Sequence, residues 1–295
     1  MTIETLLGAG TAVGAVLGGA GASVLAVESL RRRPLRSSVL VKRWQTWTVL
    51  ALMWLVALSH PIAMFVVLAF VGTVSAVEYA RLAGLHGSDR VVLTCLPVLT
   101  LTAISFGFDA GAVLIVSMMT ATVAPILGQD VATGPRRIGR VALGLVVAVV
   151  PAGALWVLGT ISTTLVLILL FGVALSDVVA FAAGSLMGGR KLAPILSPNK
   201  TWSGVAGNLV GATAGVLIAS TVSPIEVRVG VVITVTIALG SIWGDLLESM
   251  LKRHVGVKDA GSMLPGFGGV LDRFDSLVMA APLLLVVSHA LEGVS

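Results

Sequence analysis

Long apolar runs dominate this chain and leave few folds open to it. A helix needs roughly 20 mostly apolar residues to cross the hydrocarbon core of a bilayer. Ten stretches meet this requirement, some only approximately: 5–27, 44–59, 61–77, 91–107, 110–128, 141–159, 162–183, 203–222, 229–245 and 275–291. Only 11% of the 295 residues are charged, against about 25% in an ordinary soluble domain. Composition therefore excludes a soluble protein of one or two domains, and also a disordered chain.

The pattern predicts an all-α, polytopic membrane protein with about ten transmembrane helices. Stretches 44–59 and 61–77 are short and meet at His60-Pro61, which predicts a tight hairpin. The N-terminal residues lack the basic region of a cleavable signal peptide, so the first stretch is expected to remain as a helix. The single Cys95 excludes an intramolecular disulfide and a zinc site built from cysteines.

The basic residues are distributed unevenly between the two sides of this predicted topology. Of the 19 Lys and Arg residues, only Arg228 falls in the connections of the second side. Because cytoplasmic loops carry an excess of Lys and Arg, the basic side is predicted to be cytoplasmic, with both termini outside. The net charge of +5 then reflects topology, and no nucleic-acid partner is expected.

Charge is most concentrated in residues 245–275, where its cost near lipid suggests a function. In GDLLESMLKR, four polar side chains recur at i, i+3, i+4 and i+7, which is one stripe on a helix. They are Asp245, Glu248, Ser249 and Lys252. The stripe could belong to a site, or it could simply meet water and lipid headgroups at a helix end.

A glycine-rich loop follows, in HVGVKDAGSMLPGFGGVLDRFDS. Its glycines can bring backbone N–H groups close to a ligand, and Asp272 and Asp275 lie one turn apart at the start of the last helix. Carboxylates from two helices suit a hard divalent ion that holds phosphate oxygens. Nearby cations would neutralise further phosphate charge: Lys252, Arg253, Lys258 and Arg273. Alternatively, the charges at this helix start serve only as caps and dipole partners.

A second polar region covers residues 177–204. Asp177 interrupts an apolar run, which suggests either a functional group or a hydrogen bond between helices. The following loop carries Arg190, Lys191 and Lys200 among Gly, Pro and Ser residues. It could bind an anion, although topology alone would also place positive charge there.

These residues together resemble the phosphatidate cytidylyltransferase (CDP-diacylglycerol synthase) family. The family signature S-x-x-K-R-x4-K-D-x-G-x5-P-G-H-G-G-x-x-D-R-x-D is matched in spacing from Ser249 to Asp275. The preceding G-D-x-x-E-S begins at Gly244, and the upstream pattern, which includes S-P-x-K-T-W, lies between Asp177 and Trp202. The strong resemblance covers 177–281, with EYARL at Glu78–Leu82 as a weaker similarity.

Three positions depart from the family pattern. Phe267 replaces the signature His, Ser203 replaces a Glu, and Phe181 replaces a Tyr. A phenyl ring can neither donate a hydrogen bond to phosphate nor exchange a proton, so these changes are expected to leave metal binding intact and to affect the lipid substrate and the catalytic rate. The chain is therefore identified as a divergent member of the family.

The resemblance implies an enzyme that joins CTP and phosphatidate into CDP-diacylglycerol and pyrophosphate, by metal-assisted attack of the lipid phosphate on the α-phosphorus. It implies Mg²⁺, alone or with a second cation, held by Asp245 and Asp272 with Asp275 and Asp259 in support. The implied catalytic residues are Asp245, Lys252, Arg253, Lys258, Asp259, Asp272, Arg273 and Asp275. The implied substrate-binding residues are Asp177, Ser197, Lys200, Thr201, Glu248, Ser249, Gly266, Gly268 and Gly269.

The expected organisation follows from the same resemblance. Residues 1–160 would form N-terminal transmembrane helices, and residues 161–295 the catalytic region. The partners would be CTP, phosphatidate or a related anionic lipid, and the bilayer of a bacterial inner (plasma) membrane, with the site facing the cytoplasm. A homodimer is the assembly that the family favours. The glycines at 10, 14 and 18 would permit close helix contact within one chain or between two.

Two other functions fit part of the pattern. A related CTP-dependent enzyme could act on another phospholipid or on a polyprenol. A secondary transporter would also use many helices and an intramembrane Asp, but transporters place their sites near the midplane and within internal repeats. Here the charges gather at one face, and no repeat is evident.

Overall fold

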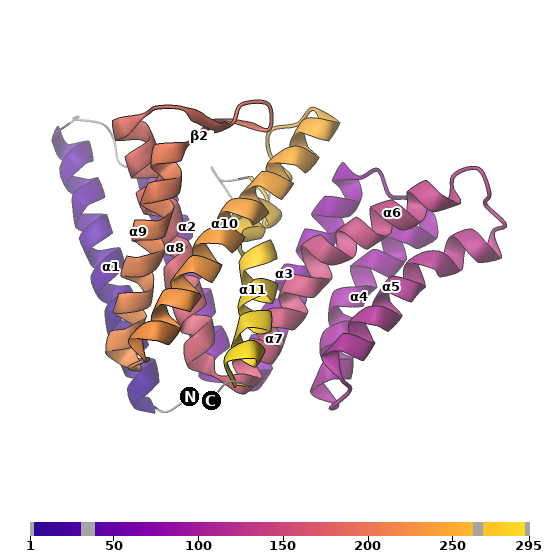
Figure 1. The fold of residues 1–295 in the computed structure, drawn as a ribbon, viewed down its shortest axis with the longest axis horizontal. Coiled ribbons are helices and arrows are strands. Elements are labelled where there is room, and N and C mark those ends of the chain that lie inside the picture. The colour runs from indigo at the N-terminus through magenta and orange to yellow at the C-terminus, as the bar shows by residue number, and fades with distance from the viewer. Residues whose placement is uncertain (1–2, 31–38, 262–267, 293–295) are drawn as a thin grey trace.

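The computed structural model describes residues 3–30, 39–261 and 268–292, and nearly all of them are helical (Figure 1). The helices are α1 (Ile3–Leu30), α2 (Val39–Ser59), α3 (Pro61–Leu82), α4 (Gly87–Ser105), α5 (Ala110–Leu127), α6 (Gly134–Gly144), the π-helical turn η2 (Leu145–Val149), α7 (Val150–Ile161), α8 (Thr163–Met187), α9 (Trp202–Val222), α10 (Val227–Val255) and α11 (Leu271–Glu292).

Eight segments of the described chain are long and apolar enough to cross a membrane, with α6, η2 and α7 forming one continuous segment. In α1 and α2 the apolar described stretches are shorter, at Leu7–Gly19 and Trp44–Ser59. The prediction of an all-α, multi-pass membrane protein is therefore confirmed, while the count of ten spans stays a prediction. The predicted hairpin is also confirmed, because α2 ends at Ser59 and α3 begins at Pro61.

A small two-stranded sheet between α8 and α9 was not predicted. Strands β1 (Lys191–Ala193) and β2 (Ser197–Thr201) pair antiparallel, with Lys191 opposite Thr201 and Ala193 opposite Ser197. Three to five residues rich in Pro and Lys give no alternating pattern, so the sequence indicates only a loop here. The hairpin holds Lys200 and Thr201 in extended backbone directly before α9.

The basic connections gather at one end of the molecule (Figure 1). The turns between α3 and α4 and between α5 and α6, the hairpin, and the last turn of α10 all lie toward the top of that view. The start of α10, which carries Arg228, lies at the opposite end with the start of α1 and the end of α11. This arrangement agrees with the charge distribution, although the membrane side that each end faces stays a prediction.

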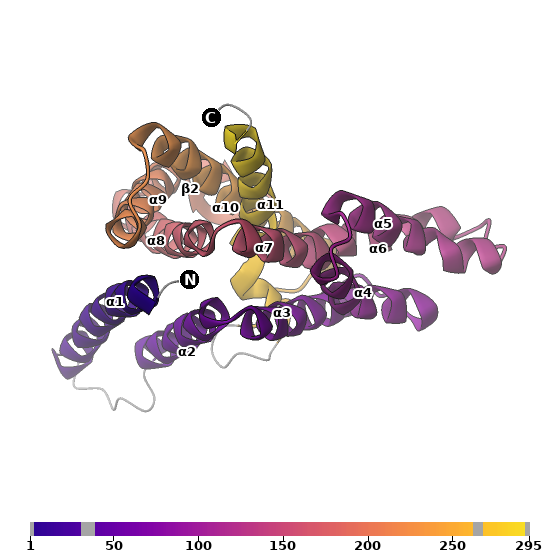
Figure 2. The same cartoon turned by 90° about the horizontal axis from the view of Figure 1, so that it is seen from below.

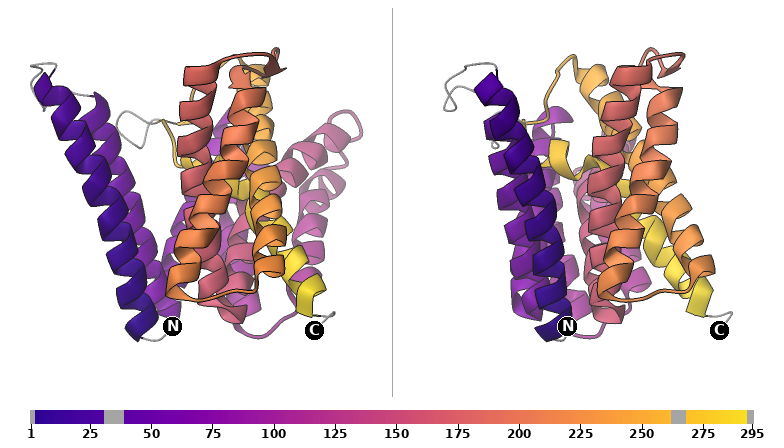
Figure 3. Two further views of the ribbon diagram at one scale, coloured as in Figure 1. Left: turned by 60° about the vertical axis from the view of Figure 1, so that its left-hand side comes forward. Right: turned by 90° about the vertical axis from the view of Figure 1, so that its left-hand side faces the viewer.

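The described helices pack around two buried hydrophobic clusters, and the larger one draws on both predicted halves of the chain. Leu68 and Leu155 from the N-terminal half join Ile168, Ile237 and Leu284 in a single buried cluster. Figure 2 shows α4, α5 and α6 extending to one side of this core, and Figure 3 shows α1 and α2 side by side along another. Since α11 packs against α3 and α7 as well as α10 and α8, the last helix ties the two halves together.

Helices α8 and α9 make the most extensive helix contact, through a row of glycines on α9. A Cβ atom added to Gly207 would lie 2.7 Å from the Val179 carbonyl oxygen, and one on Gly215 would lie 2.5 Å from that of Phe171; Gly211 faces Leu175 equally closely. At the glycines predicted to pack in the first helix, at 10, 14 and 18, a Cβ atom would meet no described atom within 4 Å. The small-residue contact therefore lies on α9, and the ridge of α1 is open within the described chain.

Candidate active site

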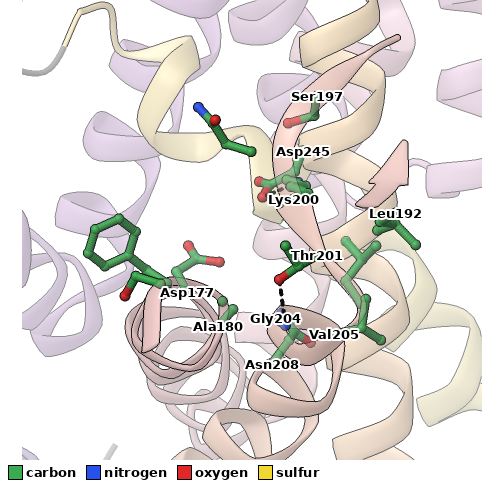
Figure 4. A pocket seen from close by; sticks show the side chains of 15 residues that line it. Asp177, Ala180, Leu192, Ser197, Lys200, Thr201, Gly204, Val205, Asn208 and Asp245 are labelled. Carbon is green, nitrogen blue, oxygen red and sulfur yellow. Dashed lines mark hydrogen bonds and ion pairs between the residues drawn. The ribbon is translucent and has the colours of Figure 1, made fainter. Parts of the chain in front are cut away.

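A polar cavity of about 550 Å³ lies between the β1–β2 hairpin and helices α8, α9 and α10. Figure 4 shows Asp177 on one side of it and Lys200 with Asp245 on the other. Ser197, Thr201 and Asn208 also line this cavity. The structure therefore brings together residues of the two polar regions that the sequence singles out, although 68 positions separate Asp177 from Asp245.

Ser276 lies between these carboxylates and was not predicted. Its hydroxyl is 2.7 Å from Asp245 Oδ1 and 3.3 Å from both carboxylate oxygens of Asp177. The other oxygen of Asp245 accepts a hydrogen bond from Lys200 Nζ at 2.6 Å. We refer to Asp177, Lys200, Asp245 and Ser276 as the cavity cluster.

The close approach of α10 and α11 makes this cluster possible. A Cβ atom on Gly244 would overlap the carbonyl oxygen of Asp275. Only a glycine at 244 therefore lets the first turns of α11 reach Asp245. Asp275 sits beside the cluster, accepts a hydrogen bond from its neighbour's N–H at 2.8 Å, and interacts electrostatically with Asp177 and Asp245.

A second cluster of charged side chains is more buried than the first and lies between α10 and the start of α11. Lys252 Nζ is 2.5 Å from Glu248 Oε2 and 2.9 Å from Asp272 Oδ1. Glu248 and Asp272 are only 3% and 5% exposed. We refer to these three residues as the buried cluster.

Asp272 also orders the backbone of the glycine-rich loop. Its carboxylate accepts hydrogen bonds from Ala260 N at 2.9 Å and Gly269 N at 2.7 Å, in addition to Lys252. Gly268 has a φ of +85°, and a Cβ atom there would overlap the Asp272 carboxylate. Asp272 thus accepts from amides of the loop that precedes α11, and not from the N–H groups of the helix's own first turn as a helix cap would, and it holds a lysine as well.

Ser203 fills a structural role where the family pattern has Glu. Its hydroxyl donates to the Gly188 carbonyl oxygen at 2.5 Å and lies 2.9 Å from Thr201 Oγ1. Thr201 in turn accepts the Gly204 N–H at 3.1 Å and caps α9. The substitution therefore preserves a polar link between the hairpin, α9 and the end of α8.

The remaining predicted residues lie around these clusters. Arg253 Nε donates to the Leu196 carbonyl oxygen at 3.4 Å, which joins the end of α10 to the hairpin. Lys258 and Asp259 are exposed, whereas Ser249 and Arg273 are partly buried. Gly266 and Phe267 lie outside the described residues, so their predicted roles stay predictions.

An apolar cavity of about 480 Å³ adjoins the polar one, between α1, α2, α8 and α11. Its walls are mostly Leu, Val and Trp side chains, including Trp44, Trp47 and Trp54. Asp177 lines both cavities, and Arg273 also lines the apolar one. A polar chamber and an apolar chamber therefore share one carboxylate at their boundary.

Comparison with known proteins decides the family. A sequence model of the cytidylyltransferase family matches residues 41–291. The chain belongs to the cytidylyltransferase family. Within it, similar proteins include those named phosphatidate cytidylyltransferase from Brucella abortus (48% identical over 120 residues, covering 40% of this chain and 44% of that protein) and Staphylococcus saprophyticus (43% over 115 residues, covering 38% and 44%). A third, from Mycobacterium leprae, is 42% identical over 114 residues, covering 38% of this chain and 36% of that protein.

The match spans less than half the length of each of these relatives.

The carboxylate oxygens of Asp245 and Asp272 are the type of donor that a hard divalent cation prefers. The two residues lie in separate clusters, however, and each now balances a lysine ammonium group. Among the described residues, no three His, Cys, Asp or Glu side chains group closely enough to hold a metal ion by themselves. Mg²⁺ does not require such a group, because it is usually held by one or two carboxylates together with substrate phosphates and water.

Sequence reasoning missed two contributors to the site. Ser276 directly follows the signature, and only the helical contact of α10 with α11 reveals its position between two carboxylates. Glu78, in the EYARL segment, is buried and accepts hydrogen bonds from the backbone at the start of α11. The weak similarity of EYARL to the family was the one sequence signal that pointed to it.

Proposed function

We propose that this protein transfers the cytidylyl group of CTP to phosphatidate or a closely related anionic lipid, releasing pyrophosphate. The observation that carries the proposal is the meeting of a polar and an apolar cavity at Asp177, beside Asp245 and Lys200. A reaction between a water-soluble nucleotide and a lipid phosphate requires such a boundary. The similar proteins named phosphatidate cytidylyltransferase support the same reaction.

In the proposed reaction a lipid phosphate oxygen attacks the α-phosphorus of CTP. A new P–O bond forms, and the bond from the α-phosphorus to the bridging oxygen breaks, so that pyrophosphate leaves with the electron pair. The attacking phosphate is already ionised at neutral pH, so no side chain has to remove a proton. The main barrier is the approach of two polyanions, which positioning and charge neutralisation lower.

The residues of this chain are assigned accordingly. Lys200 at the rim of the polar cavity would bind CTP phosphates, and Arg273 at the apolar cavity would bind the lipid phosphate. Lys258, exposed beyond α10, and Arg253, beside the hairpin, would guide the nucleotide inward. Mg²⁺, held by Asp245 and Asp272, would neutralise phosphate charge and hold its oxygens. Asp177 and Asp275 would support the same charge balance from α8 and α11.

The orientation in the membrane belongs to the same proposal. If the basic end faces the cytoplasm, as the charge distribution favours, CTP reaches the polar cavity directly from solution. The lipid enters sideways from the bilayer through the apolar cavity. In this orientation the protein lies in a bacterial inner membrane, and both of its termini face away from the cytoplasm. The homodimer and the second cation remain predictions.

A second candidate is a CTP-dependent enzyme that acts on another phospholipid or a polyprenol. The observation that favours it is Phe181, which lines the polar cavity, is 72% exposed, and replaces the usual Tyr. Purified protein with labelled CTP, Mg²⁺ and a panel of lipids separates the two by mass spectrometry. A CDP-lipid supports the first proposal, whereas CDP with a phosphorylated lipid supports the second.

The role of the apolar cavity is tested by filling it. Ala174 lines this cavity on α8, and we expect Ala174→Phe to raise the KM for phosphatidate at least about fivefold, as expected for a pocket that loses several methylenes of contact. The KM for CTP should stay within about twofold. Ala112→Phe is the matched control, because Ala112 is exposed on α5 and lines neither cavity. Equal KM values for phosphatidate in both variants would contradict the assignment.

A further inference from the structure

Glu78 on α3 contacts the start of α11, although 193 positions separate it from Leu271 in the sequence. Its Oε1 accepts a hydrogen bond from Val270 N at 3.1 Å, and its Oε2 accepts one from Leu271 N at 2.8 Å. Glu78 is only 3% exposed. Val270 directly precedes α11 and Leu271 begins it, and the N–H groups at a helix start have no partner within the helix.

Two glycines shape the loop around this carboxylate. A Cβ atom on Gly269 would meet three Glu78 atoms, the nearest of them overlapping, and one on Gly261 would overlap Glu78 Oε1. The loop backbone therefore closes on the carboxylate from two sides. The positive end of the α11 dipole offsets the negative charge, which makes a buried glutamate tolerable here.

The helix that carries Glu78 is itself firmly fixed. The next residue, Tyr79, is 1% exposed, and its hydroxyl donates to the Arg140 carbonyl oxygen at 2.8 Å. A Cβ atom on Gly144 would lie 2.8 Å from the Tyr79 ring, so α3 is locked against the segment formed by α6 and η2. Glu78 thus projects from a rigid support toward the loop.

Glu78 holds the start of α11, and this helix start carries several residues of the site. The first two turns of α11 carry Asp272, Arg273, Asp275 and Ser276. Asp272 reaches into the buried cluster and Ser276 into the cavity cluster. A shift of this helix start would therefore disturb both clusters at once, and misplacement of about 1 Å can cost 10²-fold in rate.

We propose that Glu78 is a positioning residue for the transfer reaction, fixing the first turn of α11 and the glycine-rich loop relative to α10. The inference rests on the proposed cytidylyl transfer for its catalytic consequence. The contact itself does not depend on that reaction. Glu78 touches neither substrate nor metal in this role, and it acts through the backbone of Val270 and Leu271.

Glu78→Gln tests the contact while preserving side-chain size. One of its two acceptor oxygens becomes an NH₂ group, which would face a backbone N–H donor instead of accepting from it. In hydrogen–deuterium exchange of the protein in detergent, without CTP or metal, we expect faster exchange in the peptide that contains residues 270 and 271. We also expect kcat to fall at least about tenfold with the KM for CTP within about twofold, as a misplaced reacting group predicts.

Glu226→Gln is the matched control for the same substitution. Glu226 is exposed beyond the opposite end of α10 and makes only a 3.5 Å ion pair with Arg228 at the surface. It should leave both exchange and kcat unchanged. Unchanged hydrogen–deuterium exchange in Glu78→Gln would refute the contact. A lowered Tm together with a wild-type kcat would show that Glu78 has only a structural role, which would overturn the proposal.

A second set of variants keeps the test decisive if Glu78→Gln fails to fold. Gly269→Ala pushes on the same carboxylate from the loop side, so it should also lower kcat while the KM for CTP stays within about twofold. In a Glu78→Ala background the new methyl group has room, so Gly269→Ala should add little further loss. Additive losses would overturn the proposal. If the wild type forms no CDP-lipid at all, the proposed function fails, while the exchange experiment still decides the Glu78 contact.

Discussion

The cavity cluster and the buried cluster use the same kinds of side chain in different surroundings. In the cavity cluster, the Lys200 and Asp245 side chains are 26% and 25% exposed. In the buried cluster, Lys252 is 17% exposed and its two carboxylate partners are each 4% exposed. The first pair can exchange its contacts with an incoming ligand, whereas the second would leave buried charges without partners if it opened.

This difference shows that a local concentration of charged residues does not by itself tell which of them act in the reaction and which hold the structure. Asp245 lines the polar cavity, and within the described chain its carboxylate accepts hydrogen bonds from one lysine and one serine. Asp272 accepts hydrogen bonds from a lysine and two backbone amides. Both can serve the same reaction, but loss of Asp245 should affect chemistry alone, and loss of Asp272 should affect chemistry and structure together.

The largest effect is expected for Asp245→Asn. The variant keeps the shape of the side chain and removes the charge that would hold Mg²⁺, so we expect loss of about 10³-fold in CDP-lipid formation. Since Asp245 is partly exposed, the Tm of the purified protein should change by less than about 2 °C. Full activity over a range of Mg²⁺ concentrations would refute the metal assignment.

Asp272→Asn should lose activity to a smaller extent, about 10²-fold, and should also be less stable. An amide has one acceptor oxygen in place of two, so one of its donors loses its partner in a buried site, at a cost of about 2 kcal/mol. For a chain of this size that lowers the Tm by about 3 °C. A thermal melt beside the Asp245→Asn variant provides the comparison, and equal Tm values in the two variants would erase the distinction between the clusters.

Lys200→Met should have the smallest of these effects. The methionine keeps most of the apolar stem and removes the ammonium group, so the KM for CTP should rise about tenfold, as expected for loss of one charged contact to phosphate. Lys191→Met is the control, because Lys191 is exposed on the neighbouring strand β1. Equal changes in the two variants would show that the hairpin attracts CTP only through its overall charge.

The sequence predicts those features of this molecule that depend on local pattern. Hydropathy finds the helices, and His60-Pro61 marks the turn between α2 and α3 because proline cannot continue the preceding helix. Motif spacing predicts that Asp245 and Lys252 share a helix face, and the structure agrees. These features depend on residues only a few positions apart.

The features that sequence reasoning missed depend on distant packing. Glu78 meets Leu271 across 193 positions, and nothing near either residue indicates the other. Ser276 gains its role only because Gly244 allows α11 to approach α10. Residues 10, 14 and 18 in α1 have the same glycine spacing as the row on α9. Within the described chain the α9 row makes close contact and the α1 row does not, since spacing alone cannot identify the neighbouring helix.

The glycine row on α9 has a consequence for how such an enzyme can evolve. Because Gly207, Gly211 and Gly215 leave no room for a side chain against α8, mutation cannot readily reshape the wall that these helices give the polar cavity. The apolar cavity is lined by side chains of α8 and α11 and also by large side chains of α1 and α2, and those of α1 and α2 can be exchanged for others of different size. We therefore expect descendants of this protein to diverge in the lipid they accept long before they diverge in the nucleotide.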